Sequence, residues 1–182
     1  MTDLSRRNFL RTSALLGATA LTACAAVKNG NITTVTLNTA KVKAYGQAGI
    51  NAIATILSIT VIATAMGAPA VALIETAGTA LAASLTAFSS ATNDTLTITY
   101  DDTNWKTKVD TILVDLNGVA TALRSGLSAA QQKVTNPIIN TAITAFNALL
   151  TVLDAFMGLL GINLSSVTDT QEATALKTLG AA

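Results

Sequence analysis

The sequence predicts an all-α protein, an antiparallel four-helix bundle with a small two-stranded β ribbon at one end. Three observations predict this fold class. Apolar residues recur at helical spacing over four long segments. Gly and Pro signals separate these segments by short connections, which favour antiparallel neighbours. The 182 residues include 34 Ala and 30 Thr but only 2 Pro, so few positions interrupt a helix.

The composition excludes several classes of chemistry. Without His, the chain cannot build a Ser-His-Asp triad or a His-ligated metal site. A single Cys allows no internal disulfide. Charged residues make up 12% of the chain and the net charge is +1, which predicts no basic surface for nucleic acid. We therefore expect no enzyme activity, no cofactor, no metal and no nucleic-acid partner.

Residues 1–23 have the organisation of an export signal and are set apart from the fold. Three Arg residues precede an apolar stretch from Thr12 to Ala20, which at 9 residues is far shorter than the roughly 20 needed to span a bilayer. The run Ser5-Arg6-Arg7-Asn8-Phe9-Leu10-Arg11 resembles the bacterial twin-arginine (Tat) consensus. The resemblance implies that a translocation receptor reads Ser5, Arg6, Arg7, Phe9 and Leu10.

A second motif, Leu21-Thr22-Ala23-Cys24, comes after the apolar stretch and resembles a lipobox. The resemblance implies lipid attachment to Cys24 and cleavage just before it; the alternative is a free Cys in an apolar segment. The signal holds 3 of the 11 basic and 1 of the 10 acidic residues, so the mature chain would keep 8 and 9, a net charge of −1. Ala25, in place of Asp, favours sorting to the outer membrane over retention in the inner membrane.

The mature chain divides into three parts. Residues 24–31 are polar and contain Gly, which predicts a lipidated Cys and a tether. Residues 32–164 are expected to form the helical bundle domain, and residues 165–182 a C-terminal tail with a short helix. Within the domain, the Thr- and Val-rich segment 32–37 is ambiguous between a strand and the lead-in to a helix, and Asn38 can cap the helix that begins after it.

The first two helices are expected over 39–65 and 69–91. The 31 residues from 44 to 74 carry no charge, and the apolar residues of the first helix cover more than one face. Such a helix is buried in a core or in a membrane. Gly67 and Pro69 mark the turn of an antiparallel hairpin. The core seam of the second helix consists of Val71, Ile74, Gly78, Leu81, Leu85 and Phe88.

Residues 95–100 alternate with a period of two, which predicts a strand that pairs with residues 33–37 in the ribbon. The third helix is expected from Asp102 or Thr103 to Gly126, with Asp115 on its polar face. Its apolar stripe is the clearest in the chain and consists of Trp105, Val109, Ile112, Leu116, Val119 and Leu123.

The fourth helix is expected over 129–160, opened by a capping box at Ser128 and Gln131 and closed by Gly161. Pro137 either kinks this helix or restarts it. Its main stripe, which Ile138, Leu149, Val152 and Phe156 widen, consists of Ile139, Ile143, Phe146, Leu150, Leu153, Met157 and Leu160. A short fifth helix is expected over 170–179, with Asp169 and Glu172 at capping-box spacing and Gly180 at its end.

A few side chains are candidates for chemistry, and each also has a simpler structural explanation. Asp101 and Asp102 precede a helix, so we expect them to cap it rather than serve acid–base chemistry or bind Ca²⁺. Glu75 and Asp154 are single carboxylates in apolar helices. We expect them to face solvent, although two that faced the interior together could share a proton or a cation. Trp105 is expected to anchor the core rather than stack on a ligand.

These observations predict a non-enzymatic lipoprotein of the cell envelope, anchored to a membrane on the periplasmic side through Cys24. It would act by packing with itself as a homo-oligomer or with an envelope partner. One alternative is a membrane-active helical hairpin formed by the first two helices, which the uncharged stretch supports. Another is a bundle that opens around a lipid or another apolar ligand.

Overall fold

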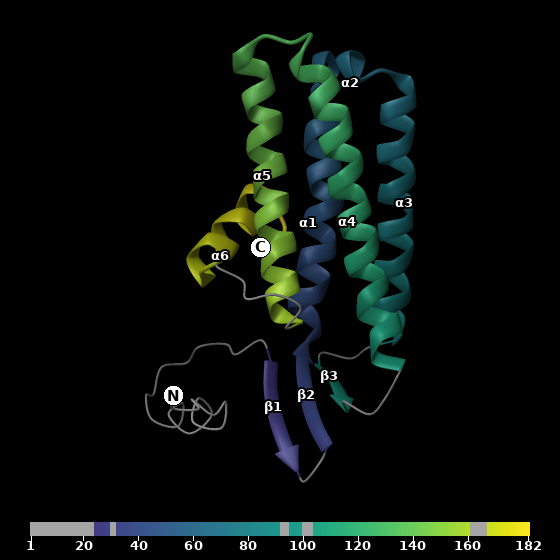
Figure 1. The fold of residues 1–182 in the computed structure, drawn as a ribbon, viewed down its shortest axis with the longest axis vertical. Helices are drawn as coiled ribbons and strands as arrows, with labels where there is room; N and C mark the ends of the chain where they lie inside the picture. The colour runs from purple at the N-terminus through teal and green to yellow at the C-terminus, as the bar shows by residue number, and fades with distance from the viewer. Residues whose placement is uncertain (1–23, 30–31, 92–94, 100–103, 161–166) are drawn as a thin grey trace, which may run out of the picture.

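The computed structural model describes residues 24–29, 32–91, 95–99, 104–160 and 167–182 (Figure 1). Helices dominate these residues, so the predicted helical class is confirmed. The signal at 1–23, Asp101, Asp102 and Gly161 lie outside the described residues. The elements in chain order are β1 (Cys24–Asn29), β2 (Ile32–Asn38), α1 (Thr39–Leu57), α2 (Thr60–Met66), α3 (Ala68–Ala91), β3 (Thr95–Thr99), α4 (Asn104–Gln131), α5 (Asn136–Leu159) and α6 (Asp169–Thr178).

Four long helices form the body of the molecule. Figure 1 shows α1, α3, α4 and α5 side by side along the long axis, each running opposite to the one before it in the chain. α1 lies in the middle and packs against α3, α4 and α5. The largest fully buried side chains of this body include Tyr45, Ile56, Leu81, Leu116 and Phe156. The sheet lies at one end of the body and α2 at the other.

The first expected helix, 39–65, is wrong as a single element, because the chain bends by 91° between α1 and α2. The Ser58 hydroxyl donates to the Thr55 carbonyl at 2.8 Å. Ile59 is extended, with φ −81° and ψ 90°, and this conformation ends the helical hydrogen-bond ladder. α2 thus turns across the end of the body, where Ile62 and Met66 are buried.

The expected boundary between the third and fourth helices is also wrong. α4 continues through Gly126 to Gln131, so neither Gly126 nor the capping box at Ser128 marks a helix end. A Cβ on Gly126 would lie 3.0 Å from Met66 Sδ, which shows that the glycine admits α2 against α4. α5 begins at Asn136 with Pro137 in its first turn. Pro137 therefore lies at the start of a new helix and does not kink a continuous one.

The predicted stripes of α3 and α4 match the core well. Ile74, Leu81 and Phe88 are buried on α3, while the other three seam residues are partly buried. The α4 stripe is fully buried from Val109 to Leu123; the side chain of Trp105 is outside the description. Most predicted positions of the α5 stripe flank the core, and the buried positions lie one residue earlier in the chain. The buried residues of α5 are Ile139, Ala142, Ala145, Leu149, Val152, Leu153, Ala155 and Phe156.

The strands form one antiparallel sheet in the order β1-β2-β3. The sheet has a strand more than the expected ribbon, because β1 occupies most of the segment expected as a tether. Cys24, the first residue of β1, lies opposite Leu37. Asn38 ends β2 and caps α1 as expected, since its Oδ1 accepts from the amides of Ala40 at 3.0 Å and Lys41 at 3.3 Å.

Candidate functional site

The face of α1 that meets α6 carries a polar cluster that the sequence did not predict. The Tyr45 hydroxyl donates to Glu172 Oε1 at 2.9 Å, and Lys41 Nζ lies 2.8 Å from Oε1 and 3.0 Å from Oε2 of the same carboxylate. Tyr45 is 1% exposed and Glu172 9% exposed. The Tyr45 ring also packs against that of Phe156 on α5, with centroids 5.2 Å apart. One carboxylate therefore joins α6 to the core.

A second contact holds the end of α6. Asn51 Nδ2 donates to the carbonyls of Leu179 at 2.8 Å and Gly180 at 3.1 Å. Gly180 adopts a φ of 62°, which favours glycine and closes the helix as expected. The start of α6 differs from the prediction by one residue, because Thr168 and Gln171 form the capping box instead of Asp169 and Glu172. Glu172 is consequently free to point at α1.

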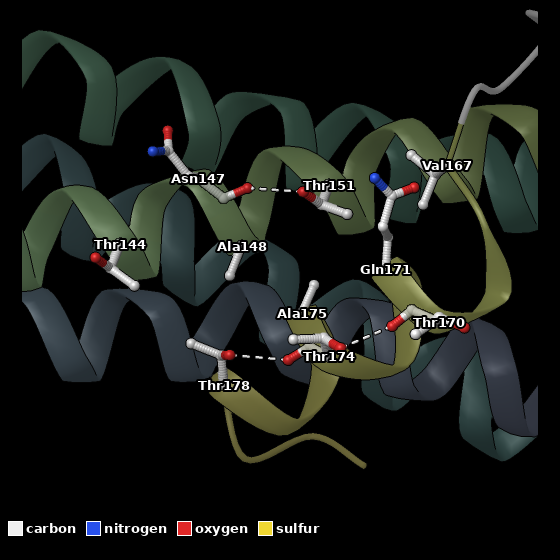
Figure 2. A pocket seen from close by; sticks show the side chains of 10 residues that line it. All are labelled: Thr144, Asn147, Ala148, Thr151, Val167, Thr170, Gln171, Thr174, Ala175 and Thr178. Atoms are coloured by element: carbon white, nitrogen blue, oxygen red, sulfur yellow. Dashed lines mark hydrogen bonds between the residues drawn. The ribbon is translucent and has the colours of Figure 1, made fainter.

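A shallow groove of about 360 Å³ lies between α5 and α6 (Figure 2). No charged residue is among the described residues that line it. The hydroxyls of Thr144, Thr151, Thr174 and Thr178 each donate to the carbonyl four residues earlier, at 2.7–3.1 Å. Each hydroxyl therefore presents its oxygen as an acceptor, beside a methyl group. The lining residues are Thr144, Asn147, Ala148, Thr151, Val167, Thr170, Gln171, Thr174, Ala175 and Thr178.

The carboxylates singled out from the sequence do not form a shared site. Glu75 is exposed on α3, as expected, while Asp154 is half-buried on α5. Among the described residues, no group of three acidic, His or Cys side chains could hold a metal ion. Asp115, expected on a polar face, is half-buried and accepts a hydrogen bond from the Ser84 hydroxyl of α3. Its role is thus to join α3 to α4.

Two of the described helices are long and apolar enough to cross a membrane, judged by length and composition. They are Ala68–Ser90 in α3, with a mean hydropathy of 1.5, and Pro137–Leu159 in α5, with 1.7. The α1–α2 pair passes the same test only as a broken span, because of its bend. Half of the apolar window in α5 is buried, against 17% of the window in α3.

Of the residues expected to direct export and lipidation, only Cys24 lies in the part of the chain that the structure describes. Ser5, Arg6, Arg7, Phe9, Leu10, Leu21, Thr22 and Ala23 precede the described residues. Cys24 is described by its backbone alone, as the first residue of β1. The twin-arginine motif is tested by comparison of the sequence with known families. The family model for the TAT (twin-arginine translocation) pathway signal sequence matches residues 3–23.

The chain carries a Tat signal. The Tat signal directs export across the membrane, to the cell envelope or periplasm, and its match includes the paired arginines Arg6 and Arg7. The match ends at Ala23, the residue before Cys24. No characterised protein and no solved structure matches the chain in the corresponding comparisons.

Proposed function

We propose that the protein is a Tat-exported lipoprotein, anchored to a membrane of the cell envelope through Cys24, with a non-enzymatic structural or interaction role. One observation carries the proposal: the match to the Tat signal ends at residue 23, directly before the one Cys of the chain. A lipobox places its lipidated Cys at this junction. Ala25 favours the outer membrane as the final location.

The described polar contacts support a structural role. Several of them join elements that are distant in the sequence: Ser84 meets Asp115, Lys133 Nζ donates to the Ala65 carbonyl at 3.0 Å, and Asn51 holds the end of α6. We class α1, α3, α4 and α5 as an antiparallel four-helix bundle with the sheet as an appendage. A partner, whether a second copy or another envelope protein, would bind to the outside of this bundle.

The lipid anchor is tested by replacing Cys24 with Ser in the full-length precursor. The variant should incorporate no labelled fatty acid, and exported protein should become soluble. A parallel Arg6→Lys, Arg7→Lys variant should leave precursor in the cytoplasm, since the Tat receptor reads the arginine pair. Membrane association of the Cys24→Ser protein equal to that of the wild type would reject the proposal.

A membrane-active hairpin is the second candidate, and the exposed surface of α3 favours it. Leu73 on α3 is 66% exposed and Val61 on α2 is 51% exposed. Against insertion, the opposite face of α3 is packed in the core, and Glu75 would have to enter the bilayer at a cost of about 2.5–3.5 kcal/mol. Dye leakage from phosphatidylcholine vesicles decides between them: we expect none from the soluble Cys24→Ser protein, and dose-dependent leakage would favour the hairpin.

A further inference from the structure

The position of Cys24 leaves no tether between the anchor and the fold. Cys24 begins β1 and lies opposite Leu37, which directly precedes Asn38, the N-cap of α1. Figure 1 shows that β1 starts beside the helical body and runs away from it to the far end of the sheet. A lipid on Cys24 would therefore attach at the waist of the molecule, between the body and the sheet.

An anchor at the waist restricts how the molecule meets a membrane. The six residues of β1 extend about 20 Å to one side of Cys24. The 24 residues of α5 extend about 36 Å along the body on the other side. If the molecule stood upright on a short thioether link, one of these parts would enter the hydrocarbon core. The sheet would bring in the unpaired backbone groups of its edge, and the body would bring in Lys41 and Lys43 at the start of α1. The long axis must then lie along the membrane surface.

The sheet order selects the side that faces the lipid. β1 is an edge strand, and in Figure 1 it lies on the side of α5 and α6, whereas β3 lies on the side of α3. The α5–α6 side contains the groove of Figure 2, whose described lining is uncharged and offers hydroxyl and amide groups. Such a surface can approach lipid headgroups without removing water from an ion.

We propose that the short link at Cys24 holds the α5–α6 face, centred on this groove, against the headgroups of the bilayer that carries the lipid anchor. The proposal rests on the proposed lipidation of Cys24, and it adds the orientation of the domain and the surface that contacts lipid. The outer face of α3, which includes the exposed residues Leu73 and Thr79, is directed away from the membrane, where it is open to other proteins.

The test uses single introduced thiols in the lipidated protein, because the natural Cys24 thiol is taken up by the lipid. Thr144→Cys reports on the groove and Thr79→Cys on the outer face of α3. The two sites are matched, since each is an exposed Thr within a long helix whose hydroxyl donates to the carbonyl four residues earlier at 2.9 Å. Each variant is reconstituted into phosphatidylcholine vesicles and labelled with a bulky, water-soluble maleimide.

We expect labelling at position 144 to be about tenfold slower than at position 79, as for a site that is open for about a tenth of the time. The rates should be equal when both variants also carry Cys24→Ser and no vesicles are present. A flexible Gly-Ser insert of twelve residues after Cys24, with a mean reach of roughly 19 Å, should restore labelling at position 144 while the protein stays on the vesicles.

Flotation of the vesicles separates the possible failures. If the protein does not float with the vesicles, the anchor is absent, and both the proposed function and the orientation are rejected. If it floats but positions 144 and 79 react at equal rates, the orientation alone is overturned. Slow labelling at position 144 in the soluble protein without vesicles would assign the face to a second copy instead. Slow labelling that persists with the insert would overturn the short link as its cause.

Discussion

At the scale of single residues, the position of α6 depends on the contacts of the Glu172 carboxylate with Tyr45 and Lys41. Replacing Tyr45 with Phe removes one donor to this buried carboxylate and keeps the ring against Phe156. We expect the free energy of unfolding to fall by about 1.5–3 kcal/mol, the usual contribution of a hydrogen bond to a charged group. Urea unfolding of the soluble Cys24→Ser protein measures the change.

Thr178→Val is the control for this substitution. It removes an exposed hydroxyl from α6 that bonds only within its own helix in the described structure, at 2.8 Å. Surface changes of this kind alter the free energy of unfolding by about 0.5 kcal/mol or less. If Tyr45→Phe has no larger effect than Thr178→Val, the Tyr45 hydroxyl contributes nothing to the docking of α6.

Two helical glycines provide a second prediction, because an added Cβ would have open space at one of them and would clash with core side chains at the other. At Gly118 a Cβ would meet nothing within 4 Å, so Gly118→Ala should stabilise the protein by about 0.5–1 kcal/mol through helix propensity. At Gly49 a Cβ would lie 2.7 Å from Leu81 Cδ2 and would also meet Leu116. Gly49→Ala should therefore destabilise by about 1–3 kcal/mol. Thermal unfolding of the two variants should shift in opposite directions; shifts of the same sign would contradict the packing of α1 on α3 and α4.

Residues with local partners can be predicted from the sequence, and those with distant partners cannot. The cap at Asn38 is predictable because its acceptor and donors lie within three residues. The residues next to Glu172 in the sequence instead indicate a local capping box. Its actual partner Tyr45 is 127 residues away, and no residue near Glu172 in the sequence indicates this contact. The groove escapes prediction for a similar reason. Its signal is present only as threonines four residues apart on α6, which become a surface once α6 packs on α5.

At the scale of the elements, the clean stripe of α4 supports a sharp test. Leu116 is fully buried in the centre of that stripe. Leu116→Asp places an unpaired carboxylate there, and we expect a loss of about 3 kcal/mol or more in the free energy of unfolding. The neighbouring exposed residue gives the matched variant, Asn117→Asp, which should change little. Far-UV circular dichroism during heating measures both, and equal midpoints would mean that the Leu116 face is not core.

The predicted element boundaries are wrong where packing overrides local signals. The apolar pattern continues through Ser58 and Ile59, so periodicity alone does not reveal the bend that separates α1 from α2. Gly126 resembles a helix stop in the sequence, whereas it admits the Met66 side chain from α2. The predicted stripe of α5 is displaced because this helix is apolar on most of its surface, and a pattern without a polar face leaves the rotation of a helix undetermined. The stripe of α4, which has a polar face, is predicted correctly from Val109 to Leu123.

At the scale of the whole molecule, α6 covers the side of the body formed by α1 and α5. Its residues Ala175 and Leu176 and its C-cap Leu179 are buried, and it contacts both α5 and α1. Ending the chain after residue 166 would expose this surface and leave Tyr45 without its carboxylate acceptor. We expect the truncated Cys24→Ser protein to lose about 3 kcal/mol or more of stability, from two buried Leu side chains alone, and to associate as its concentration rises. Urea unfolding and sedimentation measure these effects; a monomer of unchanged stability would contradict the docking of α6.

The docking of α6 also has a consequence for the order of events during synthesis. Lys41 and Tyr45 leave the ribosome early, but their partner Glu172 lies 131 and 127 residues later. The cluster can close only once residue 172 has been made, so a chain that stalls before it cannot complete this part of the fold. The Tat route commonly carries proteins that have folded before export. A chain released before residue 172 would therefore reach the Tat machinery without this contact.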